Sequence, residues 1–338
     1  MADGLARHAY PAAVVEVGNA AGVLWREAFG RLTYDRAAPV ATDSTIFDLA
    51  SLTKVIATTS LVMRAVEAGR LSLESRVADF QTGWRATDRA AVTIRHLLDH
   101  SSGLPPRVRL WERGSRGRAD FERGIAETPL EFTPGSRAVY SDLDFILLGF
   151  ILEDIGRAPL DVQFAALAAE VGADLGYRPA SAIVERIAPT EDDPWRGRVL
   201  RGEVHDENAA ALDGVAGHAG LFGTAGAVGT WARVVLASFT QRTPLGSPAL
   251  MHTFATRTGV PESSRALGWD TMLPTSSCGT RMSPAAIGHT GFTGTSMWID
   301  REKDLYVVLL TNRVHPTRAN ETLLALRPRL HDAVVGAL

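Results

Sequence analysis

The 338-residue chain has a single cysteine, Cys278, which excludes an internal disulfide and any zinc site built from cysteines. No stretch approaches the roughly 18 consecutive apolar residues of a membrane span, and residues 1–13 lack the apolar core of a signal peptide. The formal net charge of −3 argues against nucleic acid as the main partner, because binding of phosphate groups needs a basic face. We therefore expect a soluble cytoplasmic protein, or an extracytoplasmic one if the true start lies upstream.

Lysine is also scarce, because only Lys54 and Lys303 occur among the 35 basic residues. Lys54 follows Ser51 by three positions, and positions i and i+3 share one face of a helix. A lysine can give up its proton in a protein whereas an arginine cannot, and a serine needs such a neighbouring base to become a nucleophile. The spacing predicts a Ser51 nucleophile with Lys54 as its proton partner, although S-x-x-K alone often arises by chance.

Strand signals lie at the two ends of the chain and helical patterns lie between them. Short apolar runs predict strands over 12–17, 22–29, 296–300 and 305–311. Helical patterns cover 51–68, 94–100, 145–155, 160–171, 228–239 and 319–338. This order predicts an α/β fold of the α+β type, with one antiparallel sheet built from both chain ends and a large helical insert. We expect residues 1–69 and 270–338 to form the sheet part and residues 70–269 the mainly helical part, with the active site between them.

Two further motifs carry side chains suited to acyl transfer. Tyr140 lies in a predicted loop just before a helix, where its phenol can share a proton with Lys54; a tyrosine packed at a helix start is the structural alternative. The segment His289-Thr290-Gly291 and nearby Thr295 precede the strand 296–300. Backbone N–H groups there can join that of Ser51 to bind an oxyanion, and a tight glycine turn is the equally weighted alternative.

Other chemistries have weaker support. His96 and His100 have the i, i+4 spacing of a helical metal pair, but no glutamate follows the first histidine, so structural histidines are favoured. His205 and His218 keep a metal hydrolase as an alternative. Six arginines between residues 107 and 123 predict a solvated, loop-like insertion rather than an anion site. No G-x-S-x-G elbow, phosphate loop or dinucleotide fingerprint is present, so we expect no metal and no cofactor.

Together, and in this order, three motifs resemble the signature elements of the serine β-lactamase and penicillin-binding-protein superfamily: Ser51-Leu52-Thr53-Lys54, Tyr140-Ser141-Asp142 and His289-Thr290-Gly291. The branch is that of class C β-lactamases, D-alanyl-D-alanine peptidases and their esterase relatives. The flanking segments 47–50, 96–105 and 134–136 look like this family too. The resemblance implies a β-lactamase/transpeptidase-like fold and a serine hydrolase that works through an acyl-enzyme without a cofactor.

Within this family, the segments 204–209, 217–222 and 288–296 look like those of exo-acting N-acetylmuramoyl-L-alanine amidases of cell-wall recycling, which generally work outside the membrane. This likeness implies a muropeptide amide as the first-choice substrate. A short-chain carboxylesterase, a weak β-lactamase or a D-alanyl-D-alanine peptidase are alternatives on the same fold. A non-catalytic penicillin-binding or sensor protein is the alternative from another class.

Two departures from the family pattern bear on mechanism. Asp142 stands where many relatives have asparagine, and a carboxylate cannot donate a hydrogen bond to a substrate carbonyl. Pairing of Asp142 with Lys54 would raise the pKa of the lysine and shift the role of base toward Tyr140. His289 replaces the lysine common in lactamases, which weakens the case for strong lactamase activity.

Two arginines follow the last predicted strand. By resemblance to class C relatives, we expect Arg318, with Arg313 as second choice, to hold a substrate carboxylate. The alternative is a pair of surface arginines in the turn before the final helix.

Overall fold

The computed structural model describes residues 1–85 and 87–338. Its largest element is a six-stranded antiparallel sheet in the order β2-β1-β11-β10-β9-β8. The strands are β1 (Ala12–Asn19), β2 (Gly22–Gly30), β8 (Asp270–Thr271), β9 (Ile287–Thr290), β10 (Ser296–Asp300) and β11 (Leu305–Thr311). The predicted sheet from both chain ends is confirmed, since β1 pairs with β11 and places Val14 opposite Leu310. The short strands β8 and β9 were not predicted.

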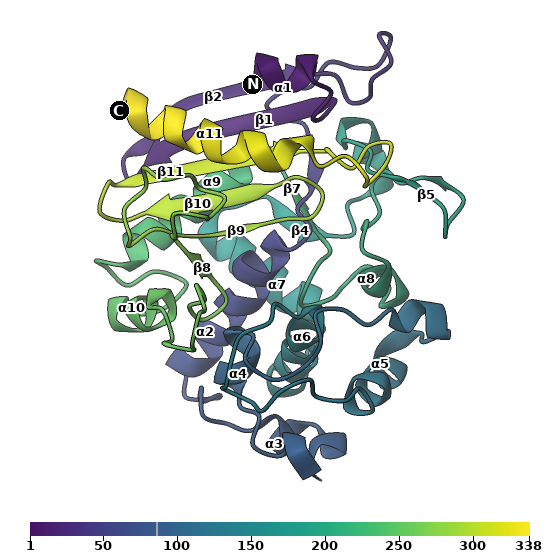
Figure 1. Ribbon diagram of the computed structural model, residues 1–338, viewed down its shortest axis with the longest axis vertical. Coiled ribbons are helices and arrows are strands. Elements are labelled where there is room, and N and C mark those ends of the chain that lie inside the picture. Colours follow the sequence, from purple (N-terminus) through teal and green to yellow (C-terminus); the bar gives the residue numbers. More distant parts are fainter. Residues whose placement is uncertain (86) are drawn as a thin grey trace.

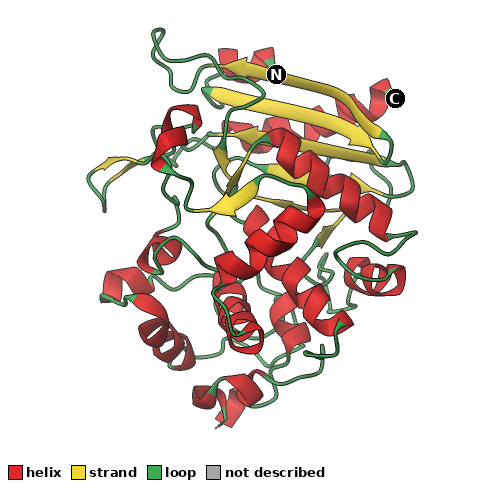
Figure 2. Ribbon diagram, turned by 180° about the vertical axis from the view of Figure 1, so that it is seen from behind, coloured by secondary structure: helices red, strands yellow, loops and turns green. Residues whose placement is uncertain are grey.

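Helices cover both faces of this sheet. Helix α11 (Thr322–Ala337) crosses one face, and α9 (Ala225–Ser238) packs on the other, against β1, β10 and β11 (Figures 1 and 2). Because side chains alternate along a strand, Val15 faces the α11 side whereas Glu16 faces α9. The buried Glu16 carboxylate accepts hydrogen bonds from Arg26 Nε (2.6 Å) and the Tyr306 hydroxyl (2.7 Å). A carboxylate buried in this way needs such partners.

The remaining helices form a second layer of the molecule, next to the free edge of β8 and β9 (Figure 1). They are α2 (Ser60–Glu67), α3 (Val77–Phe80), α4 (Ile94–Leu98), α5 (Gly117–Ala126), α6 (Asp142–Gly156), α7 (Leu160–Val171), α8 (Glu207–Ala211) and α10 (Pro248–Ala255). A five-residue helix α1 (Ala2–Ala6) packs against β2 and α11. Among the described residues, no helix is both long enough and apolar enough to cross a bilayer.

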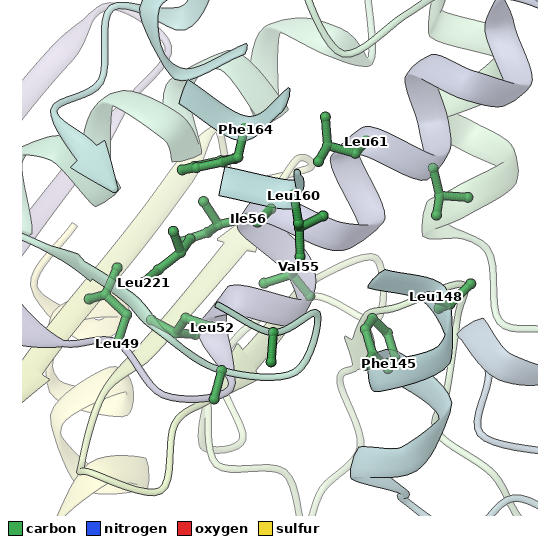
Figure 3. Close-up of a cluster of buried hydrophobic side chains, with 14 of the residues drawn as sticks. Leu49, Leu52, Val55, Ile56, Leu61, Phe145, Leu148, Leu160, Phe164 and Leu221 are labelled. Carbon is green, nitrogen blue, oxygen red and sulfur yellow. The ribbon is translucent and has the colours of Figure 1, made fainter. Parts of the chain in front are cut away.

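The helix predicted over 51–68 is present, but its first part, Lys54–Thr59, is a π-helix that continues into α2. All six residues of the π-helix are buried. Its apolar side chains Val55 and Ile56 pack in a cluster with Phe145 of α6 and Phe164 of α7 (Figure 3). Single π turns within helices occur often at functional sites, and this one begins three residues after Ser51.

The expectation of a loop-like insertion over 107–123 was wrong for its second part, from Gly117 onward. A 3₁₀ turn covers Leu110–Arg113, and α5 begins at Gly117. Phe121 and Ile125, four residues apart on α5, are fully buried and hold the helix against the core. Two of the arginines bind carboxylates on other helices, Arg118 with Asp154 of α6 (2.6 Å) and Arg107 with Glu207 of α8 (2.5 Å).

A small sheet of three short strands connects the helical layer to the start of the π-helix. Its order is β3-β7-β4, with β3 (Phe47–Asp48), β4 (Leu175–Tyr177) and β7 (Leu221–Gly223). Two more short strands, β5 (Asp192–Asp193) and β6 (Arg198–Val199), pair separately. Helix α9 belongs to the stretch 70–269 and yet covers the large sheet. The division into two parts at residues 69 and 270 stays a prediction.

Candidate active site

The turn that leads into Ser51 is held from several directions. Ala50 has a left-handed backbone (φ +47°), a conformation that costs free energy for a residue with a Cβ. The Asp48 carboxylate accepts hydrogen bonds from the N–H of Ala50 (2.8 Å) and of His205 (2.7 Å). The hydroxyls of Thr293 and Thr295 donate to the carbonyls of Asp48 (2.7 Å) and Leu49 (3.0 Å). These contacts fix a strained turn, as is common at functional sites.

Ser51, Lys54 and Tyr140 meet at this turn. Lys54 Nζ donates to Ser51 Oγ (3.0 Å), and the Tyr140 hydroxyl donates to the same oxygen (2.8 Å). Lys54 Nζ also donates to Asp142 Oδ1 (2.8 Å) and to the carbonyl oxygen of His218 (3.1 Å). The structure thus brings Lys54 and Tyr140 into hydrogen-bond distance of Ser51 Oγ, as expected from the sequence, and it shows the ion pair between Lys54 and Asp142.

The surroundings favour the protonated forms of both Lys54 and Tyr140. Burial alone would lower the pKa of Lys54, but the Asp142 carboxylate and the Tyr140 phenol outweigh it, so the pKa is raised. Burial raises the pKa of Tyr140, against the opposing effect of Lys54. At neutral pH the resting site therefore holds an ammonium and a neutral phenol, both donating to Ser51 Oγ.

The Tyr140 ring lies between two buried histidines, with ring centroids 4.7 Å from His100 and 5.8 Å from His289. His100 Nδ1 accepts from the N–H of Ser141 (3.1 Å) and lies 3.0 Å from Asp144 Oδ2. That second contact needs a proton on Asp144, and burial raises the pKa of this carboxyl well above its usual range. Burial also lowers the pKa of His100 well below its usual range. His100 is thus a neutral ring that positions Tyr140.

His96 does not share a site with His100. Its Nδ1 accepts from the N–H of Thr93 at the start of α4, and the Thr93 hydroxyl accepts from the N–H of His96. Such reciprocal bonds cap a helix N-terminus, so this histidine has a structural contact of its own.

His289 lies on β9, opposite Met297 of β10. Its Nδ1 is 2.8 Å from the Thr290 carbonyl oxygen, so this nitrogen carries the proton and donates it there. Burial lowers the pKa of His289 well below its usual range, which keeps the ring neutral. Its Nε2 has no hydrogen-bond partner within the described residues. A lysine in this position would bring a positive charge, and His289 does not.

Gly291 and Phe292 continue β9 past the serine. A Cβ at Gly291 would come within 2.6 Å of the Leu49 carbonyl oxygen, so the strand end packs directly on the turn before Ser51. The backbone N–H groups of Ser51 and Phe292 make no hydrogen bond within the described residues. Thr295 is fully buried behind them, where its hydroxyl binds Leu49. Sequence reasoning missed Phe292, although it directly follows the third motif.

Two pockets meet at Ser51. The first, which we call the His289 pocket, has a volume of about 270 Å³. It is lined by Ser51, Tyr140, Arg265, Asp270, His289, Thr290, Gly291, Phe292, Arg313, Leu324 and Arg327. The second, which we call the Asp206 pocket, has a volume of about 110 Å³. It is lined by Ala50, Ser51, Arg107, Tyr140, Asp142, His205, Asp206, Glu207, His218, Ala219, Phe292 and Arg318.

In the Asp206 pocket the charged groups are paired. Arg318 binds Glu191 (2.5 Å) and Glu207 (2.9 Å), and His218 Nε2 lies 2.8 Å from Asp206 Oδ1. Burial would raise the pKa of Asp206, but His218 and Arg107 hold it well below its usual range. Arg313, in the His289 pocket, has no carboxylate partner within the described residues. These contacts favour Arg313 over Arg318 as the cation open to a ligand, the reverse of the order expected from the sequence.

Comparison with known proteins agrees with this geometry. A family model described as Beta-lactamase matches residues 1–329. The chain is 32% identical over 336 residues to a putative D-alanyl-D-alanine carboxypeptidase of Escherichia coli K12, covering 87% of this chain and 76% of that one. It is 32% identical over 305 residues to an N-acetylmuramyl-L-alanine amidase of Bacillus subtilis 168, covering 80% and 68%. A penicillin-binding-protein homologue from Caulobacter crescentus has a similar structure, with a TM-score of 0.79 at 19% identity over 100% of this chain and 95% of that one.

The chain therefore belongs to the β-lactamase family and has the serine β-lactamase fold of its hydrolases. Both the predicted family and the predicted fold class are confirmed. The catalytic roles of individual residues stay predictions.

The close packing of Gly291 gives a first test of the site. Gly291→Ala should push the end of β9 away from the turn before Ser51. Because misplacement of about 1 Å can cost about 100-fold in rate, we expect labelling of the protein by a fluorophosphonate to slow by a factor of that order. Gly176→Ala is the matched control, since a Cβ at Gly176 meets nothing within 4 Å. Equal labelling rates in the two variants would contradict the proposed contact.

Proposed function

We propose that the protein is a serine hydrolase that cleaves an amide bond through an acyl-enzyme, with a muramoyl-peptide amide as its first-choice substrate. The observation that carries this proposal is the position of Ser51 Oγ. It accepts hydrogen bonds from both Lys54 and Tyr140 at the point where two pockets meet. A serine hydroxyl next to proton-transfer groups and next to unpaired backbone N–H groups is suited to attack a carbonyl carbon.

The contacts of Lys54 favour Tyr140 as the immediate base. An ammonium has three protons to donate, and Lys54 directs them to Ser51, Asp142 and the His218 carbonyl. The Asp142 carboxylate stabilises the charged lysine, and the charged lysine in turn favours a phenolate at Tyr140. Loss of one proton from this pair therefore leaves a phenolate 2.8 Å from the Ser51 hydroxyl.

In the first half of the reaction, Tyr140 takes the proton of Ser51 while Oγ forms a bond to the substrate carbonyl carbon. The N–H groups of Ser51 and Phe292 bind the oxyanion of the tetrahedral intermediate. The proton then passes to the leaving nitrogen, the C–N bond breaks, and the amine departs. In the second half, water gives a proton to Tyr140 and attacks the ester carbon. Tyr140 then passes that proton to Ser51 Oγ as the ester C–O bond breaks, which releases the acid and regenerates the Ser51 hydroxyl.

The substrate preference is supported by the location of the amidase-like segments. His205, Asp206 and Glu207 from the segment 204–209, together with His218 from 217–222, line the Asp206 pocket beside Ser51. The relative from Bacillus subtilis is named an amidase, whereas the Escherichia coli relative is named a putative carboxypeptidase. The segments that distinguish subgroups by sequence thus lie where a substrate would contact the protein.

Intact-mass spectrometry with substrate turnover tests the proposal. The protein is incubated with a muramoyl dipeptide, a D-alanyl-D-alanine peptide, a β-lactam and a short-chain chromogenic ester. We expect release of the peptide from the muramoyl dipeptide, and no turnover or covalent adduct in Ser51→Ala, with unchanged folding by circular dichroism. Turnover of the D-alanyl-D-alanine peptide alone would contradict the amidase assignment. A stable adduct without turnover would indicate a sensor, and full labelling of Ser51→Ala would contradict the site.

The two lysines offer a matched pair of substitutions. Lys54→Arg keeps the positive charge but places a group at the site that does not deprotonate and does not fit the three acceptors in the same way. We expect kcat/KM to fall by about 100-fold or more, in the range of a lost acid–base group. Lys303→Arg, in the exposed turn between β10 and β11, should retain normal activity. Similar activity in both variants would show that Lys54 has no role in proton transfer.

Asp142 gives a prediction about pH dependence. The carboxylate raises the pKa of both Lys54 and Tyr140, and activity requires that this pair lose a proton, so kcat/KM should rise with increasing pH. Asp142→Asn lowers both pKa values and should move the ascending limb of the kcat/KM profile to lower pH. Asp154→Asn on the same helix is the control, because Asp154 pairs with Arg118 away from the pockets. An unchanged profile, or a shift to higher pH, in Asp142→Asn would contradict the proposed base.

A further inference from the structure

Three arginine side chains in the His289 pocket form no ion pair with any described residue. Arg265 precedes β8, Arg313 follows β11, and Arg327 lies on α11, so each comes from a different element. In the part of the chain that the structure describes, none of these guanidinium groups lies within 4.0 Å of a carboxylate oxygen. The arginines of the Asp206 pocket differ, because Arg107 and Arg318 both bind Glu207.

Arg327 is the least exposed of the three, with 4% of its surface accessible. One of its terminal nitrogens donates to the Thr295 carbonyl (3.3 Å), and its Nε has no partner within the described residues. Burial, and then the nearby Arg313, lowers the pKa of Arg327 to about 10, so the group still carries its charge at neutral pH. A buried charge without a counter-ion is costly to folding, and a ligand with negative charge would remove that cost.

Arg313 and Arg265 are positioned in the pocket wall by different contacts. Arg313 donates to the carbonyl of Asn320 (2.6 Å), and its guanidinium lies 4.9 Å from the centroid of the Phe292 ring. The Arg265 guanidinium lies 5.2 Å from the centroid of the Tyr140 ring. Its side chain makes no hydrogen bond to any other described residue. Stacking on an aromatic ring orients a guanidinium without neutralising it.

The charges that line this pocket leave an excess of two. Three guanidinium groups face one lining carboxylate, Asp270, whose Oδ1 accepts hydrogen bonds from Ser264 Oγ (2.5 Å) and the N–H of Thr271 (3.0 Å). Three positive charges less one negative charge give +2, and the neutral His289 adds nothing. One arginine can hold one carboxylate through two parallel hydrogen bonds, so three arginines exceed what a single carboxylate needs.

We propose that the His289 pocket binds a part of the substrate that carries two negative charges, most simply two carboxylates. This inference rests on the proposed hydrolase activity, because it assigns the substrate class of the same site. An acidic peptide fragment with a terminal carboxylate and a side-chain carboxylate has the required charge. A phosphate monoester carries a charge of about −1.5 to −2 and is the alternative source of the same chemistry.

Calorimetric titration of the Ser51→Ala protein tests the pocket without turnover. The probes are N-acetyl-alanyl-glutamate with two carboxylates, N-acetyl-alanyl-glutamine with one, and inorganic phosphate. We expect the dicarboxylate to bind at least about 10-fold more tightly than the monocarboxylate, as one additional hydrogen-bonded charge provides. Equal affinities for the two peptides would overturn the proposal. Tighter binding of phosphate than of the dicarboxylate would overturn the assignment of two carboxylates.

Arginine variants in the same Ser51→Ala background then locate the binding. Arg327→Gln and Arg265→Gln should each weaken the dicarboxylate about 10-fold or more, with a smaller effect on the monocarboxylate. Arg329→Gln is the matched control, since Arg329 lies two residues further along α11 with a 70% exposed side chain. Arg265 is only partly buried, so its variant remains informative if Arg327→Gln does not fold by circular dichroism. Full dicarboxylate affinity in both folded variants would overturn the proposal.

The two proposals fail in different ways. If the dicarboxylate binds through these arginines but the unsubstituted protein hydrolyses no amide or ester, the hydrolase function is wrong and the anion pocket stands. If amides are hydrolysed but the dicarboxylate does not bind, the anion pocket is wrong and the hydrolase function stands.

Discussion

The pairing of β1 with β11 is the constraint on which the rest of the molecule depends. It joins residues nearly 300 positions apart in the sequence, with Val14 opposite Leu310. Strand β10 pairs with β11 and β9 with β10, and the segment between β9 and β10 places the hydroxyls of Thr293 and Thr295 on the turn before Ser51. The geometry around Ser51 therefore depends on a contact between early and late parts of the chain. This geometry forms only when β1 and β11 have paired.

The sequence was informative where local spacing decides the outcome. Ser51 lies at the turn before the π-helix and Lys54, three residues later, begins that helix, so a short spacing brings them together. The hairpin strands 296–300 and 305–311 are long enough to show their apolar pattern. Strands β8 and β9 have two and four residues, too few for a periodic signal, and their positions depend on the pairing of β9 with β10 and of β8 with β9. Local spacing also could not place Arg265 and Arg327 in one pocket, because the fold of the sheet and α11 brings them together.

The distribution of charge divides the site into two kinds of environment. On one side of Ser51, carboxylates neutralise the cations, as Glu191 and Glu207 do for Arg318. On the other side the guanidinium groups have carbonyl oxygens and aromatic rings as near neighbours, which orient them without neutralising them. In a partly dehydrated pocket such charges act over longer distances than in water. Electrostatics, more than shape, is what would distinguish one end of a bound substrate from the other.

The scarcity of lysine has a practical consequence. Lys54 is fully buried and makes three hydrogen bonds, so Lys303 is the one lysine that solvent reaches. Lys303 lies in the turn between β10 and β11, at the opposite end of β10 from Ser296. Of the two lysines, a reagent that acylates amines would therefore meet only Lys303. Lys303 is thus a single lysine through which the protein can be anchored to a surface or joined to a dye.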